Sequence, residues 1–189
     1  MNHAGFSLYS AWGTILRGWA ITELGSSEEG TAQILQGLAA YRATGAELGR
    51  SYFLALLASA YGNARQAHTG LSVLAEALAM VDKTGERYYE AELRRLEGEL
   101  MLQRSSFQTG GSASAEEAEA CFQKAIAVAH HQGAKSLELR SVLSLARLWQ
   151  RQGKSAQARQ RLAEIFDTFT EGFETADLRQ TKVLLDDLQ

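Results

Sequence analysis

A spacing of 40 residues between small side chains recurs along the chain and restricts its fold more than any other feature. One series of glycine and alanine residues, at intervals of 40, 40 and 48, consists of Gly18, Ala58, Gly98 and Ala146. A second series, at intervals of 40, 48 and 40, consists of Gly30, Gly70, Ala118 and Ala158. Both series place one insertion in the same part of the chain. Such a period indicates one supersecondary unit copied four times.

Each unit is predicted to be a pair of antiparallel helices. Between residues 134 and 158, apolar side chains follow a helical spacing up to Trp149. Gly153 then ends this helix, and Ser155 is expected to cap the next. A turn between units also repeats, as residue pairs that end in glycine: Thr44–Gly45, Thr84–Gly85, Gln132–Gly133 and Glu171–Gly172. One hairpin cannot bury its apolar side alone, so neighbouring hairpins are expected to stack.

We therefore expect an all-α chain of four helical hairpins and a C-terminal capping helix. Within a single domain over residues 1–189, the hairpins are predicted at 5–44, 46–84, 86–132 and 135–172. The capping helix is predicted at about 175–188, with Thr175 as its cap. The insertion predicts a Ser/Gly-rich loop over 103–115 in the third hairpin. It is either a tolerated surface insertion or a regulatory or docking loop.

The hairpins resemble tetratricopeptide repeats (TPR). In that family the first helix carries a bulky residue, leucine, a small residue and an aromatic, and the second carries alanine, an aromatic and alanine. The last hairpin matches with Val142, Leu145–Ala146 and Trp149, then Ala158, Leu162 and Ile165. The resemblance implies a right-handed α–α superhelix, a solenoid whose first helices line a concave groove. The period here is longer than the family's length of about 34 residues.

A narrower resemblance is to the C-terminal TPR region of bacterial multidomain signalling proteins, in which a nucleotide cyclase or transcriptional regulator is fused to an NTPase. Its segments are GLAAYRATGAELGRSYFLALLASAYG, LAEALAMVDKTGERYYEAELRRLEGELML and AEACFQKAIAVAHHQGAKSLELRSVLSLARLWQRQGK. This similarity implies a non-enzymatic interaction or scaffold module that binds a protein or peptide. The alternative is a small-molecule-sensing regulatory tail of a signalling ATPase or transcriptional regulator.

Composition narrows the classes of function. The net charge of −3 provides no basic field for nucleic acid. No apolar run approaches the roughly 18 residues of a membrane span. The single cysteine, Cys121, cannot form an internal disulfide and gives no sign of an oxidising compartment. Taken together, these features predict a cytoplasmic protein without nucleic-acid or membrane partners.

No catalytic, cofactor or metal site is predicted. The four histidines are scattered, and no glycine-rich phosphate loop follows a strand. Cys121 is interpreted either as a small buried residue or as a reactive thiol. The chain is therefore expected not to be an enzyme.

Partner contacts are expected on the first helices. Matching the family motif, the groove-facing positions are Trp12, Trp19, Tyr52, Ser59, Asn63, Glu92, Arg95, Glu99, Arg140, Arg147 and Arg151. From Lys135 to Arg161 there are seven basic residues and one acid, Glu138. Within this segment Arg140, Arg147 and Arg151 form a stripe along one helix face. Arginine can bind carboxylates bidentately, which favours an acidic partner; the alternative is an ordinary solvated face.

The first predicted helix is unusually aromatic. Trp12 and Trp19 either cap the core or contact a partner. An uncovered aromatic surface at this end would favour homo-oligomer formation.

Overall fold

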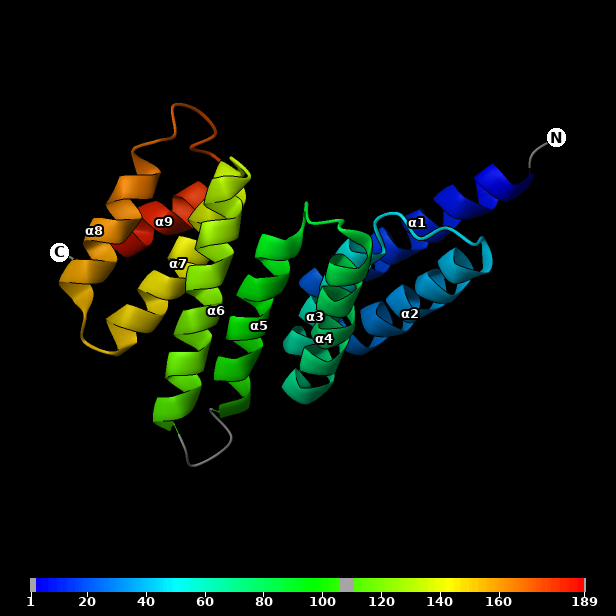
Figure 1. The fold of residues 1–189 in the computed structure, drawn as a ribbon, viewed down its shortest axis with the longest axis horizontal. Helices are drawn as coiled ribbons and strands as arrows, with labels where there is room; N and C mark the ends of the chain where they lie inside the picture. Colours follow the sequence, from blue (N-terminus) through cyan, green and yellow to red (C-terminus); the bar gives the residue numbers. More distant parts are fainter. Residues whose placement is uncertain (1–2, 106–110, 189) are drawn as a thin grey trace. The chain divides into compact units, whose positions relative to one another are not determined.

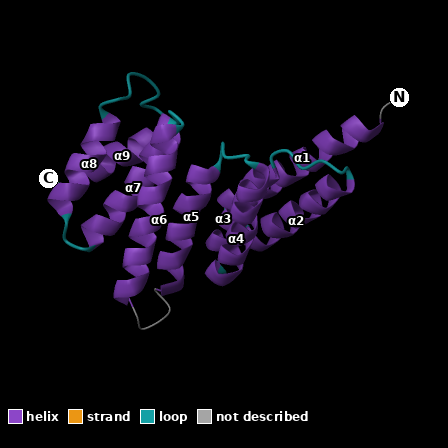
Figure 2. Cartoon of the chain, viewed as in Figure 1, coloured by secondary structure: helices purple, strands orange, loops and turns teal. Residues whose placement is uncertain are grey.

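The computed structural model describes residues 3–105 and 111–188, with side-chain detail from residue 7 and, after the gap, from residue 114. All regular structure in these ranges is helical (Figures 1 and 2). The chain divides into two compact units, Met1–Tyr89 and Glu90–Gln189, each described by itself. The expected single domain over 1–189 stays a prediction. Within the described ranges no helix combines the length and apolar character needed to cross a bilayer.

Unit 1 consists of two helical hairpins. Its helices are α1 (His3–Glu23), α2 (Ser27–Ala43), α3 (Arg50–Asn63) and α4 (Ala67–Thr84). α1 packs against α2, α3 packs against α4, and α3 also contacts both helices of the first hairpin. Fully buried side chains between them include Ile15, Ile34, Tyr41, Phe53 and Leu74.

Unit 2 consists of two further hairpins and a closing helix. Its helices are α5 (Glu90–Ser105), α6 (Gly111–His131), α7 (Lys135–Arg151), α8 (Ser155–Phe166) and α9 (Ala176–Asp187). Phe122, Leu139, Val142 and Leu162 are at most 1% exposed in the core of this unit. α9 contacts α7 and α8 and adds Leu178 and Leu184 to the same core. The predicted capping helix is therefore present and covers apolar surface.

The small residues of the repeat mark close helix crossings, as predicted. A Cβ atom added at Gly18 would lie 2.8 Å from the backbone oxygen of Gly30. One added at Gly98 would lie 2.6 Å from the Phe122 ring. The helices can approach this closely only because these positions have no side chain.

The repeated turns adopt the conformation that glycine favours. Gly45, Gly85, Gly133 and Gly172 all have φ between 65° and 77°. A side chain at such an angle would crowd the backbone, so glycine is the residue that most easily ends each hairpin here. The prediction of these turns is confirmed.

Several predicted element bounds differ from the structure. The loop expected at 103–115 is too long, because 103–105 belong to α5 and 111–115 to α6; residues 106–110 lie outside the described part. Extending an existing helix costs little, so the Ser/Gly-rich composition did not stop either helix where expected. The second and third hairpins begin later than predicted, at Arg50 and Glu90.

The predicted caps are only partly correct. Thr175 precedes α9 with extended backbone, but its side chain makes no capping hydrogen bond in the described structure. Ser155 is already the first helical residue of α8, and Lys154 takes the cap position. The Ser155 prediction was therefore wrong by one residue.

Candidate functional site

Two of the three predicted aromatic positions of unit 1, Trp12 and Tyr52, contact other aromatic rings. The rings of Trp12 and Tyr52 each lie 5.5 Å from the ring of Phe53, and Tyr52 lies 4.9 Å from Tyr89. The Trp12–Phe53 and Tyr52–Tyr89 pairs are edge-to-face, a geometry that stabilises a fold beyond the area it buries. Trp12 and Tyr52 therefore contribute to packing within unit 1, and their contact with a partner stays a prediction.

The other predicted positions of unit 1 are more accessible. Trp19 is 36% exposed on α1, where Tyr9 is 69% exposed. Ser59 is half-buried, and the exposed Asn63 donates a hydrogen bond to Glu23 Oε1 at 3.1 Å. These residues do not converge on a pocket that the structure shows.

In unit 2, Glu92 is the centre of an ion network. Its side chain is 3% exposed and receives Arg95 Nη2 at 2.8 Å and Arg140 Nη2 at 2.9 Å. Burial raises the pKa of the Glu92 carboxyl, but the charges and hydrogen bonds of Arg95 and the charge of Arg140 outweigh it and lower the pKa below its ordinary value. The carboxylate is therefore kept ionised by two guanidinium groups.

The network continues to Glu99. Ser144 Oγ donates to Glu99 Oε1 at 2.6 Å, and Arg95 Nη1 lies 3.5 Å from the same oxygen. Arg140 Nε also lies 3.9 Å from Asp177 of α9. Four of the predicted site residues, Glu92, Arg95, Glu99 and Arg140, thus bind one another and connect α5, α7 and α9.

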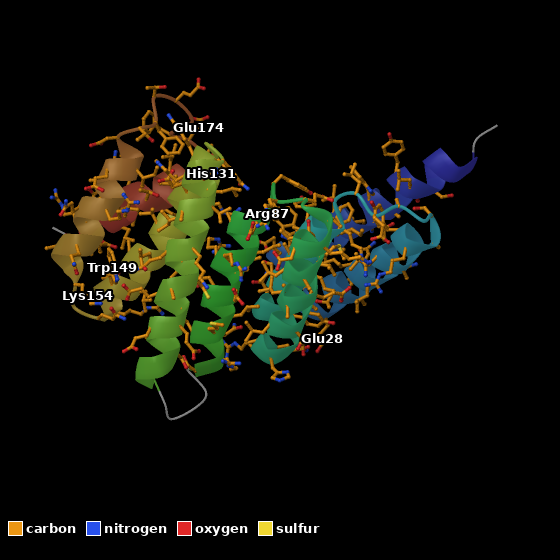
Figure 3. The ribbon with its side chains drawn as sticks, viewed as in Figure 1. Glu28, Arg87, His131, Trp149, Lys154 and Glu174 are labelled. Atoms are coloured by element: carbon orange, nitrogen blue, oxygen red, sulfur yellow. The ribbon has the colours of Figure 1, made fainter. Side chains whose placement is uncertain are left out.

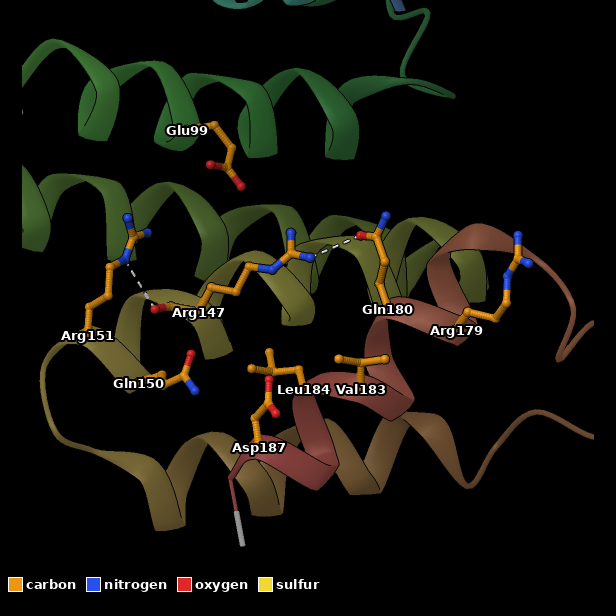
Figure 4. A pocket seen from close by; sticks show the side chains of 9 residues that line it. All are labelled: Glu99, Arg147, Gln150, Arg151, Arg179, Gln180, Val183, Leu184 and Asp187. Carbon is orange, nitrogen blue, oxygen red and sulfur yellow. Dashed lines mark hydrogen bonds between the residues drawn. The ribbon is translucent and has the colours of Figure 1, made fainter.

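The remaining predicted arginines line an open hollow of about 650 Å³ beside α9, which we call the arginine hollow (Figure 4). Arg147 and Arg151 enter it from α7, and Arg179 enters it from α9. Arg147 Nη2 donates to Gln180 Oε1 at 3.0 Å, and Arg151 Nε donates to the Arg147 backbone oxygen at 3.3 Å. These bonds hold two guanidinium groups at the mouth of the hollow.

The arginine hollow carries positive charge that its own acids do not neutralise. Among the described residues, Arg147, Arg151 and Arg179 form no ion pair within 4.0 Å. Glu99 also lines the hollow, but it is already bound by Arg95 and Ser144. Asp187 lines it as well, which leaves three cations against two acids. An anionic group is the complementary ligand.

Sequence reasoning missed Arg179 and Gln180. Both follow the buried Leu178 on a helix that was expected only to cover the core. Their position beside Arg147 depends on how α9 packs against α7, which no local pattern specifies. The one sequence signal for them was that two polar residues, Arg179 and Gln180, directly follow an apolar position that was expected to face the core.

A second hollow, of about 560 Å³, is lined by residues of α6, α7 and α8. Trp149, which is labelled in Figure 3, is one of them. The Trp149 indole nitrogen is buried without a hydrogen-bond partner among the described atoms. Glu138, with its side chain 10% exposed, lines the same hollow and lies 3.3 Å from His130 Nδ1. An aromatic ring and a nearly buried carboxylate therefore face this space.

Cys121 does not have the environment of an activated thiol. It is buried, and burial together with the nearby Glu97 carboxylate raises its pKa to about 11. This supports the interpretation of Cys121 as a packing residue.

Comparison with known proteins identifies the fold. No family model matches the sequence, and no curated protein matches it. The TPR-like repeats of a putative kinesin light chain from Podosopora anserina match at a TM-score of 0.67 and 18% identity, over 100% of this chain and 87% of that chain. A substituted form of the same protein matches at a TM-score of 0.68 and 17% identity, with the same coverage. The chain therefore has a TPR-like repeat fold.

Proposed function

We propose that this chain is a non-enzymatic protein-interaction module that binds a segment of a partner protein in the arginine hollow of unit 2. The observation that carries the proposal is the set of three guanidinium groups of Arg147, Arg151 and Arg179 without ion-pair partners among the described residues. The TPR-like fold supports it, because repeat folds present extended surfaces for binding. Arginine also suits recognition of anionic groups through paired hydrogen bonds.

A peptide selection tests this function. A random peptide library is selected on the immobilised full chain, and enriched peptides are measured by isothermal titration calorimetry. We expect binding that the double variant Arg147→Glu/Arg151→Glu abolishes, because it reverses two charges in the hollow. Failure to enrich any peptide, or affinities unchanged in that variant, would contradict the proposal.

A small-molecule sensor is the second candidate, and the hollow around Trp149 favours it. The Trp149 side chain and the nearly buried Glu138 line a concave site, and the Trp149 indole N–H is buried without a hydrogen-bond partner among the described atoms. A thermal-shift screen with sugars, nucleotides and amino acids tests it, since a ligand that binds only the folded state raises the melting temperature. The variant Trp149→Phe should remove any such shift.

We also propose a wider setting, from the composition for the cellular location and from the sequence resemblance for the kind of protein. We place the module in the cytoplasm, as a regulatory part of a bacterial signalling protein. The exposed Tyr9 and Trp19 on α1 favour self-association through that helix. Sedimentation equilibrium tests this point, and a monomer at high concentration would contradict it.

A further inference from the structure

The hollow around Trp149 adjoins a third hollow of unit 2, of about 340 Å³. His130, Glu138 and Arg161 line both spaces. The hollow around Trp149 also has an apolar part, which includes Ile126. Its volume of about 560 Å³ lies in the range that is typical of small-molecule sites. The size of this hollow therefore suits a small ligand.

Glu138 places a nearly buried negative charge in the hollow. Its side chain is 10% exposed, and each carboxylate oxygen lies 3.3 Å from Nδ1 of His130. Among the described residues, no lysine or arginine nitrogen lies within 4.0 Å of this carboxylate. An uncharged imidazole can donate a hydrogen bond to a carboxylate but does not neutralise it. A cationic group is therefore the ligand that complements Glu138.

The nearby basic residues are bound to other groups. Arg161 Nη1 lies 3.1 Å from Glu164 Oε2. Lys135, which lines the third hollow, donates from Nζ to the Thr168 backbone oxygen at 3.3 Å. Because Glu164 opposes the charge of Arg161, the charge of Glu138 is the one left without a counter-ion in the hollow around Trp149.

Trp149 adds an aromatic surface to the same hollow. The residue is half-buried and packs partly against the core of unit 2. An indole ring attracts ammonium groups through its π electrons more strongly than other aromatic side chains do. A carboxylate and an indole that line one concave space therefore favour an organic cation over an anion or a neutral sugar.

We propose that the hollow around Trp149 binds a small primary amine in its ammonium form, an inference that rests on the small-molecule function above. The ammonium group replaces His130 as the donor to Glu138, and the His130 side chain, which is 78% exposed, turns into solvent. A primary ammonium group has three N–H donors for the two carboxylate oxygens, which a quaternary one lacks. The alkyl chain of the amine lies against the apolar part of the hollow, which Ile126 and Leu145 line.

Titration of the full chain with butylammonium chloride at constant ionic strength tests this proposal. Proton–nitrogen correlation NMR follows the indole N–H signals, and the signal that is missing in Trp149→Phe identifies Trp149. We expect butylammonium to shift this signal and to bind about tenfold more tightly than butanol, its uncharged counterpart. Butanoate, of opposite charge, should not bind. Equal binding of butylammonium and butanol, or tighter binding of butanoate, would overturn the inference.

Variants with a matched control locate the site. Glu138→Gln should weaken butylammonium binding by about tenfold, because the amide keeps the shape of the side chain and removes its charge. His130→Ala should strengthen binding by about twofold, because it removes the group that competes for the carboxylate. Glu117→Gln, at an exposed position on α6, is the control and should change nothing.

Circular dichroism establishes that each variant folds. Unchanged affinity in a folded Glu138→Gln would overturn the inference. If that variant does not fold, His130→Ala decides at an exposed residue, and weaker or unchanged binding there would overturn the inference.

A lysine side chain of a protein carries the same ammonium group as a free amine. A tripeptide with lysine between two glycines and with blocked ends should therefore be compared with butylammonium, and we expect it to bind less tightly. Tighter binding of the tripeptide would overturn the inference of a small amine. A melting shift with a sugar or nucleotide, but none with butylammonium, would also overturn it and would leave the small-molecule function in place.

Discussion

Gly18 and Gly13 lie on the same helix, but an added methyl group would meet different surroundings at the two positions. At Gly18 it would lie 2.8 Å from two backbone atoms of α2, whereas at Gly13 nothing lies within 4 Å. The repeat pattern singled out Gly18 from the sequence. The close approach of α2 explains why only one of these glycines is required.

Alanine substitutions should therefore have opposite effects at these two glycines. Gly18→Ala should lower the free energy of unfolding by roughly 1–3 kcal/mol, because the backbones must separate. Gly13→Ala is the control and should raise it by about 1 kcal/mol, because alanine favours a helix more than glycine does. Urea denaturation measures both. A stabilised Gly18→Ala would contradict the tight crossing.

The buried ion pairs of Glu92 with Arg95 and Arg140 should contribute to the stability of unit 2. Glu92→Gln should lower the free energy of unfolding at pH 7 by about 2–3 kcal/mol, because it leaves the guanidinium groups of Arg95 and Arg140 without their buried counter-ion. Glu171→Gln, at an exposed position, is the control and should have little effect. Urea denaturation at several pH values provides the measurement.

The effect of Glu92→Gln should depend on pH in one direction. The folded pKa of Glu92 lies below its ordinary value of 4.5, so its contribution to stability is present above pH 4.5 and is lost as the pH falls through the folded pKa. The variant does not titrate at this position. The difference between the two proteins should therefore shrink as the pH falls below 4.5, and a difference that grows there would be inconsistent with this assignment.

At the scale of elements, α9 both covers the core and forms one side of the arginine hollow. Leu178→Ala should lower the free energy of unfolding by about 2–4 kcal/mol, because the side chain is 3% exposed and its loss leaves a cavity. Val183→Ala, at a 60% exposed position on the same helix, should change it by less than about 0.5 kcal/mol. Chemical denaturation distinguishes the two. Similar losses would show that α9 does not pack as described.

The existence of the helices was largely predictable, because apolar periodicity and the repeated glycine turns are visible in the sequence. Gly45, Gly85 and Gly133 marked the turns correctly. The end of α5 and the start of α6 were missed, because composition measures only local preference and not the stability of a helix that is already formed. Ser155 was misplaced by one residue for a similar reason, since a cap depends on backbone geometry.

At the scale of the whole molecule, the two compact units predict separable folding. The core cluster around Phe122 and Leu162 consists only of residues from unit 2. A fragment of residues 90–189 should therefore melt cooperatively, as followed by circular dichroism and by the fluorescence of Trp149, its one tryptophan. A fragment of residues 90–174, which lacks α9, should melt at a lower temperature. A non-cooperative transition in the longer fragment would refute this expectation.

The candidate site was only partly predictable at this scale. The stripe of Arg140, Arg147 and Arg151 was visible in the sequence, but one member is bound to Glu92 and the other two lie in the arginine hollow. The acidic residues that pair with Arg140 lie on α5 and α9. The sequence of α7 alone therefore could not show that Arg140 is ion-paired whereas Arg147 and Arg151 are not. Which residues of the hollow bind a partner stays a prediction.

α9 lines the arginine hollow with Arg179 and Gln180 and also buries Leu178 and Leu184 against the core. A partner bound in the hollow, as proposed, would therefore also stabilise the helix that covers the core. Binding of the partner and resistance of α9 to local unfolding would then be coupled, because the partner binds only when α9 is folded. A bound segment should slow deuterium uptake at the amides of this helix, even at sites that it never touches.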